Sequence, residues 1–216
     1  LNGERKVARQ AARSCFSVSR PITFPLAPRQ KALIRETLVS EDVSKALDMA
    51  RILSNCESVD AEERAKAILD RMIVELETGT THSRSLIGFA LCFGNIGSDA
   101  ITFLKSAYES TTTEPGRQYL LLARGYAGDE SASDLLLVLL ESNIDIEKRR
   151  IAIYAYGRAL GRNAISGLQR LMEDTESVYG HHGLERPIAE AAWIELYRLK
   201  RELDLDIEIG PVPRPN

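Results

Sequence analysis

Two adjacent histidines, His181 and His182, come closest to a metal site by residue type, since Glu185 follows three residues later. They lie in an expected loop of about a dozen residues between Thr175 and Arg186. Metal ligands must converge on one point, whereas neighbouring side chains on a loop usually point apart. We therefore expect no metal and no cofactor. The loop is longer than most connections between helices, which suits contact with a partner.

Other chemistry-bearing patterns are absent from the sequence. There is no nucleophile elbow, P-loop or dinucleotide fingerprint. The segments 94–97 and 125–128 each begin and end with glycine, but each lies between two expected helices and not after a strand. Close helix packing is the simpler interpretation of both. Carboxylates are numerous, yet their spacing singles out no pair, so no catalytic residue is assigned.

The three cysteines, Cys15, Cys56 and Cys92, are too scattered for a disulfide framework or a structural zinc site. Cys92 lies in the apolar stretch 89–93 and is expected to be a small buried hydrophobe. This usage suits a reducing compartment, so we expect a cytoplasmic protein. Because the chain begins at Leu1, a cleaved signal or an upstream domain stays open.

Composition and charge narrow the class of protein. Of 216 residues, 44% are hydrophobic and 27% charged, as in ordinary folded proteins, and no apolar run approaches the roughly 18 residues of a membrane span. The formal charge of −3 is unevenly distributed. Residues 1–40 carry eight basic and two acidic side chains, a net +6, which leaves −9 for the rest. The basic segment suits nucleic acid, an anionic membrane or an acidic partner; a solvated face that offsets the acidic body is the simpler explanation.

Hydrophobic periodicity predicts helices almost everywhere and hence an all-α fold. Apolar residues recur at helical spacing from Ala46 to Leu53 and from Ala65 to Leu76. Ser40 is the expected cap of the first of these helices, and Asp60 that of the second. Nowhere do long alternating, β-branched runs indicate strands.

Three segments repeat a common plan of two helices. A glycine that can adopt a left-handed conformation ends each first helix, at positions 31 and 33 residues apart: Gly97, Gly128 and Gly161. A second glycine lets the paired helices approach closely: Gly94, Gly125 and Gly157. A short polar turn is expected to cap each second helix: Asp99, Asp129 and Asn163. Apolar residues recur at identical offsets in the second helices from Ala100 and Ala164, and such hairpins must stack to bury them.

Paired arginines at Arg149 and Arg150, an Ala-Leu-Gly ending at Gly161 and an Ala-Ile-Ser-Gly-Leu ending at Leu168 carry a family resemblance. The segment resembles HEAT-like repeats of the short class first noted in phycobilin lyases. The turn aspartate of that pattern is present at Asp129, while the other repeats depart from it.

The resemblance covers residues 84–174 and implies a right-handed α-solenoid over residues 41–204, in which 41–78 form a degenerate pair and 187–203 a terminal helix. Residues 1–40 are expected to form a basic lead-in with short helices and a proline-rich link. Residues 205–216 are expected to form an extended proline-rich tail.

Aligning the second helices by their alanines gives candidate binding residues. Equivalent outward positions hold Lys105 in the first repeat, Leu137 and Val138 in the second, and Gln169 and Arg170 in the third. The resemblance implies that second helices line the concave face, where Leu137 and Val138 would form an apolar patch with a polar rim. The alternative is that local packing buries both residues.

Members of such repeat families serve as scaffolds, lyases, inhibitors and DNA glycosylases, so the resemblance favours several functions. We expect a non-enzymatic scaffold that binds a protein partner, with a homodimer through the same patch left open. A bilin-lyase-like subunit or chaperone acting with a second chain is the alternative. A glycosylase, and nucleic acid as a partner, are least favoured because residues 41–216 are net acidic and the only tryptophan, Trp193, lies on the terminal helix. The His-Glu dyads of HEAT-like hydroxylases are absent.

Overall fold

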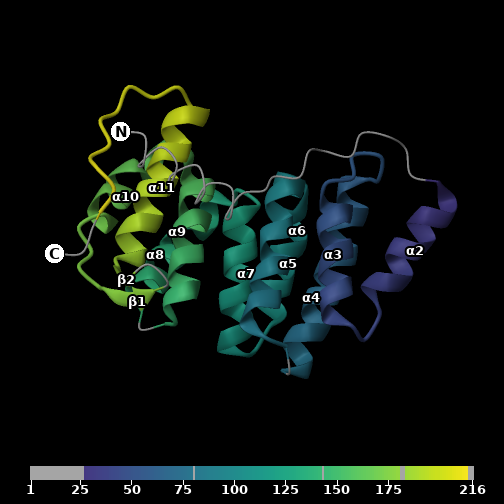
Figure 1. Ribbon diagram of the computed structural model, residues 1–216. Helices are drawn as coiled ribbons and strands as arrows, with labels where there is room; N and C mark the ends of the chain where they lie inside the picture. Colours follow the sequence, from purple (N-terminus) through teal and green to yellow (C-terminus); the bar gives the residue numbers. More distant parts are fainter. Residues whose placement is uncertain (1–26, 80, 143, 181–182, 214–216) are drawn as a thin grey trace.

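The computed structural model describes residues 27–79, 81–142, 144–180 and 183–213, and this part of the chain is mostly helical (Figure 1). The α-helices are, in chain order, α2 (Pro28–Leu38), α3 (Val43–Ser54), α4 (Ala61–Thr78), α5 (Ser83–Ile96), α6 (Ile101–Ser110), α7 (Glu114–Tyr126), α8 (Ser133–Glu141), α9 (Ile146–Leu160), α10 (Ile165–Leu171) and α11 (Pro187–Glu202). Short 3-10 turns precede α6, α8 and α10: η1 (Gly97–Ala100), η2 (Glu130–Ala132) and η3 (Gly161–Ala164). The predicted all-α class is confirmed.

A small hairpin interrupts the helical pattern between α10 and α11. Strands β1 (Val178–Gly180) and β2 (Gly183–Glu185) pair antiparallel, with Val178 opposite Glu185. The segment expected to be a plain loop therefore contains a short ladder. Strands of three residues are too short to show an alternating pattern. His181 and His182 lie outside the described residues.

The helices stand side by side in chain order, from α2 at one end to α11 at the other (Figure 1). Successive odd-numbered helices pack against each other: α3 against α5, α5 against α7, α7 against α9 and α9 against α11. The helices α4, α6, α8 and α10 each pack against the odd-numbered helix that follows. One hydrophobic cluster runs through the row from Ile34 to Leu205, so the core is continuous along the molecule.

Glycines shape the repeats at the two predicted places. The backbone has a positive φ at each glycine that ends a first helix: Gly97 (77°), Gly128 (83°) and Gly161 (54°). The other set, expected to bring the two helices of one pair together, packs differently: at Gly125 the close backbone contact is with α9, the first helix of the next pair. A Cβ placed on Gly125 would lie 2.7 Å from the Cβ of Ala155 and 3.0 Å from its backbone oxygen. The backbones of α7 and α9 can therefore approach this closely because residue 125 has no side chain.

The structure confirms the predicted cap of α4 but not that of α3. The Asp60 carboxylate accepts hydrogen bonds from the backbone N–H groups of Glu62 (3.0 Å) and Glu63 (3.1 Å), which confirms the cap of α4. Helix α3 is capped by Asp42, which accepts from the N–H of Lys45 (3.1 Å), and not by Ser40. Asp42 stands immediately before the first helical residue, where a capping side chain reaches the first turn.

The polar turn residues of the repeats do not share one role. Asp129 accepts a hydrogen bond from the N–H of Ser131 and caps η2. Asp99 and Asn163 were expected to cap α6 and α10, but those helices begin after Ala100 and Ala164 without a side-chain cap. The 3-10 turns that precede α6 and α10 already lead the backbone into each helix, so the expected caps are wrong at these two positions.

The C-terminal segment packs back onto the last helix. Helix α11 begins at Pro187, as predicted. Beyond it, the chain is extended, but Leu205 is buried and the indole N–H of Trp193 donates to the carbonyl of Gly210 (2.8 Å). The predicted tail is therefore extended and anchored over residues 205–213. Residues 214–216 and the basic residues within 1–26 lie outside the described chain.

Candidate partner-binding surface

A hollow open to solvent lies between α6, α7 and α8, with a volume of about 190 Å³. Its apolar lining comes from Tyr108, Leu121, Leu135, Val138, Leu139 and Ile144. Its polar lining comes from Glu114, Arg117, Gln118 and Ser142. Pockets for small molecules usually measure about 300–1,000 Å³. The hollow is therefore smaller than an ordinary small-molecule pocket and has the size to admit one large side chain.

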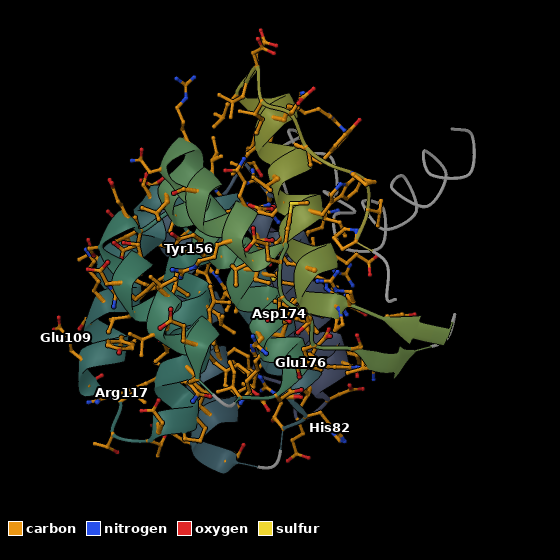
Figure 2. The ribbon with its side chains drawn as sticks, turned by 90° about the vertical axis from the view of Figure 1, so that its left-hand side faces the viewer. His82, Glu109, Arg117, Tyr156, Asp174 and Glu176 are labelled. Carbon is orange, nitrogen blue, oxygen red and sulfur yellow. The ribbon has the colours of Figure 1, made fainter. Side chains whose placement is uncertain are left out.

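The connection between α6 and α7 forms one edge of the hollow. Thr111 donates its hydroxyl to the carbonyl of Ala107 (2.8 Å), and Arg117 donates its Nε–H to the carbonyl of Thr111 (2.8 Å). The Arg117 guanidinium lies over the Tyr108 ring, 5.9 Å from its centre. Arg117 and Glu109 point to the same side of the molecule (Figure 2). The arginine is thus held in place at the edge.

Helix α8 supplies the exposed apolar part of the hollow. Leu135 is 40% and Val138 64% exposed, whereas Leu136, Leu139 and Leu140 are buried. Residues three apart on a helix share a face, so Leu135 and Val138 form one outward stripe. A short helix whose outer stripe is apolar leaves that surface available for a partner.

The predicted apolar pair separates in the structure. Val138 is exposed and lines the hollow, but Leu137 is half-buried and packs against the core. Neighbouring residues on a helix are rotated by about 100°, so Leu137 faces away from the stripe that Val138 occupies. Leu135, and not Leu137, lines the hollow together with Val138. The spacing of three between Leu135 and Val138 is the signal that could have found this pair in the sequence.

The other predicted residues do not line the hollow. Lys105 of α6 lies 3.2 Å from the Oδ1 atom of Asp129 and ties the first repeat to the turn of the second. Gln169 and Arg170 are exposed on α10. Arg170 lies 3.4 Å from Glu141, in a pair whose two side chains are both 65% exposed and which contributes little to stability.

A buried network behind the hollow holds Tyr108. Arg124 donates its Nε–H to Oδ2 of Asp129 (2.8 Å), and Ser131 donates its hydroxyl to Oδ1 (2.6 Å). The Arg124 guanidinium also lies 5.1 Å from the centre of the Tyr108 ring. Burial would raise the pKa of Asp129, but the hydrogen bonds from Ser131, Arg124 and Lys105 outweigh it, so the pKa is below its ordinary value. The carboxylate is therefore ionised at neutral pH and fixes both basic side chains.

A second buried carboxylate, Glu195 of α11, had no signal in the sequence. Arg198 donates two hydrogen bonds to it, at 2.9 and 2.5 Å. Burial raises the pKa of Glu195, and the charges of Arg198 and Arg158 oppose that shift. The positive charges of Arg198 on α11 and Arg158 on α9 compensate the negative charge of this buried carboxylate, which therefore links the two helices. We assign it no chemical role.

The buried thiol of Cys92 should be unreactive, because burial raises its pKa to about 12. At pH 8 a thiol with that pKa is ionised in about one molecule in ten thousand. We expect Cys92 to resist iodoacetamide at pH 8 in the native protein and to react fully in denaturant, as read by peptide mass spectrometry. Free glutathione in the same tube is the control. Native labelling of Cys92 at the rate of glutathione would contradict the burial.

Two further kinds of site concern the described residues: metal sites and membrane spans. There, no group of three or more His, Cys, Asp or Glu side chains could hold a metal ion. One helical stretch, Ser83–Ser110, is long and apolar enough to cross a membrane by length and composition. It is the exception to the expectation that no such run exists. Gly97 divides it into α5 and α6, and half of its most apolar window is buried in the protein, as in the core of many helical proteins.

No protein-family model matches the chain. No curated protein and no solved structure matches it either. The HEAT-like resemblance therefore stays a prediction.

Proposed function

We propose that this chain is a non-enzymatic scaffold that binds a protein partner through the hollow between α6, α7 and α8. One observation carries the proposal: Leu135 and Val138 are exposed apolar side chains at the mouth of a hollow with a polar edge. Apolar surface of this kind, rimmed by polar groups, is typical of protein-binding sites. A bulky side chain buried in such a hollow would carry much of the binding energy.

In this proposal the row of helices is a right-handed solenoid of HEAT-like repeats. The recurrence of buried leucines supports it, because the same offset in α6, α8 and α10 holds Leu104, Leu136 and Leu168, each fully buried. The contacts between successive odd-numbered helices also suit a stacked array. A stacked array would offer its partner a preformed surface, which reduces the entropy lost on binding.

The size of the hollow supports a protein side chain as its occupant over a chromophore. At about 190 Å³ it is smaller than ordinary small-molecule pockets, and a bilin is a large one. The excess of acidic over basic side chains in residues 41–216 opposes a nucleic-acid groove. A protein scaffold therefore fits these features better than a lyase or a glycosylase.

Charging the apolar stripe should abolish partner binding. We expect Val138→Asp to deplete the partner at least tenfold when the tagged chain is purified from its native source and quantified by mass spectrometry, because a carboxylate would enter an apolar contact. Val74→Asp is the matched control, since Val74 is an exposed valine on α4. It should retain the partner at the wild-type level.

Thermal unfolding by circular dichroism separates binding from folding in this experiment. Val138 is well exposed, so its replacement should change the free energy of unfolding by no more than about 0.5 kcal/mol. Equal recovery of the partner by Val138→Asp and wild type would contradict the proposal. So would co-purification of pigment or nucleic acid with both proteins in place of a protein.

A further inference from the structure

Exposed carboxylates occur on each of the three helices that bound the hollow, and one of them lines it. Glu114 lines the hollow at the start of α7. Glu109 follows Tyr108 directly, near the end of α6. Asp134 and Glu141 lie four residues before and three residues after Val138, on the same face of α8. All four side chains are exposed. We call Glu109, Glu114, Asp134 and Glu141 the acidic rim.

Nearby basic groups offset the acidic rim only in part. Arg117 is engaged with Tyr108 and with the carbonyl of Thr111. Lys105 faces the buried Asp129, and Lys148 donates to the side-chain oxygen of Gln118 in the lining (3.3 Å). Arg170 lies 3.4 Å from Glu141, in an exposed and therefore weak pair. From residue 130 to residue 141 the chain has three acidic side chains and no lysine or arginine. The surface around the apolar stripe therefore carries an excess of negative charge.

We propose that the partner binds through a basic segment that carries one bulky apolar side chain. This inference rests on the proposed function and names the class of its partner. The apolar side chain enters the hollow against Leu135 and Val138, and lysines or arginines on either side face the acidic rim. Asp134 and Glu141 are seven residues apart, which is about 10 Å along a helix, so basic side chains flanking a single anchor can face both.

Charge also determines which segments are rejected. An acidic or phosphorylated segment would bring like charges against the rim, which lowers both the rate of association and the affinity. The chain's own residues 1–26 have the favoured character, with five basic residues and one acidic residue. They are therefore the competing occupant, and the experiment has to distinguish them from a partner segment.

The test uses the full chain and a fluorescent synthetic peptide, AKRAAKAFAKRAAKA, which places a single phenylalanine between basic side chains. Binding is followed by fluorescence anisotropy at low salt. Replacing the phenylalanine with alanine should weaken binding about tenfold, the loss expected for one buried aromatic anchor. Replacing every lysine and arginine with glutamate should abolish binding. Tight binding of the glutamate peptide would overturn the proposal.

Paired variants of the protein locate the charge effect. Asp134→Asn/Glu141→Gln should bind the basic peptide about tenfold more weakly than wild type, and the difference should shrink in high salt because surface charges are screened. Asp70→Asn/Glu77→Gln removes the same charge from exposed positions on α4 and should bind as wild type does. Equal weakening by both pairs would overturn the acidic rim as the determinant.

Photo-cross-linking from position 138 identifies the occupant. A benzophenone amino acid there should link to the peptide when peptide is present. Linkage to residues 1–26 of the same chain that the peptide fails to displace would overturn the assignment to a partner. If the glutamate peptide binds but native partner capture still depends on Val138, the partner class fails and the scaffold function stands. If capture does not depend on Val138, the scaffold function fails.

Discussion

Replacing Asp129 with alanine is expected to lower the free energy of unfolding by about 3 kcal/mol. The substitution leaves the Arg124 guanidinium, which is 8% exposed, without its carboxylate. A buried charge that loses its partner pays the full cost of its desolvation. Urea unfolding followed by circular dichroism at 222 nm measures the change. Asp99→Ala alters the exposed aspartate in the preceding repeat and should leave stability within about 0.5 kcal/mol of wild type.

Two further measurements test the cause. Replacing both Arg124 and Asp129 with leucine should recover much of the loss, because no charge is then left buried. The difference between wild type and Asp129→Ala should also depend on pH. The folded-state pKa of Asp129 is lowered, so its contribution is complete above the unfolded value of about 3.9 and disappears as the pH falls through the lower folded value. A difference that stayed constant from pH 6 to pH 2 would contradict the ion pair.

Adding a single methyl group at Gly125 should also lower the free energy of unfolding substantially. We expect Gly125→Ala to destabilise the protein by about 2 kcal/mol, since overpacking costs up to about 3 kcal/mol and alanine's helix propensity returns about 1 kcal/mol. The new Cβ would meet the Cβ and the backbone oxygen of Ala155, which cannot move without displacing α9. Urea unfolding measures this change as well.

Gly88→Ala is the matched comparison for Gly125→Ala. A Cβ at Gly88 would lie 2.7 and 2.9 Å from the two terminal methyl carbons of Leu47, which can rotate away. Its stability should therefore remain within about 1 kcal/mol of wild type. Equal losses at the two glycines would show that the contact between α7 and α9 is not the tight one.

The sequence predicted best those features that depend on local backbone requirements. Gly97, Gly128 and Gly161 could be read from their position after an apolar helix, since a left-handed conformation is costly for other residues. Helical periodicity predicted the apolar faces of α6 and α10 in the same way: Leu104, Ala107 and Leu168 are buried, and the other apolar residues of these faces are partly buried against the core. These local signals were sufficient for the all-α class and for the spacing of the helix pairs.

The candidate site was predicted only in part, because it depends on contacts between distant residues. Val138 lines the hollow as one of the predicted residues, but Leu135 was not predicted, because equivalence between repeats does not give the angle between two residues around α8. Lys105, predicted to point outward and bind a partner, instead pairs with Asp129, which lies 24 residues further along the chain and cannot be recognised as its partner from the sequence. The hollow is lined by residues as far apart in the sequence as Tyr108 and Ile144, and no pattern within one helix predicts that both line one hollow.

The anchoring of the C-terminal segment gives this protein an internal optical reporter at one end. Its only tryptophan, Trp193, stacks on Tyr197 with ring centres 5.4 Å apart and bonds to Gly210. Indole emission therefore registers detachment of residues 205–213 and melting of α11, while circular dichroism registers every helix together. Because helices in the row contact mainly their neighbours, the two signals can separate if the last helix frays before the middle of the molecule. Coincident transitions would mark the row as a single cooperative unit.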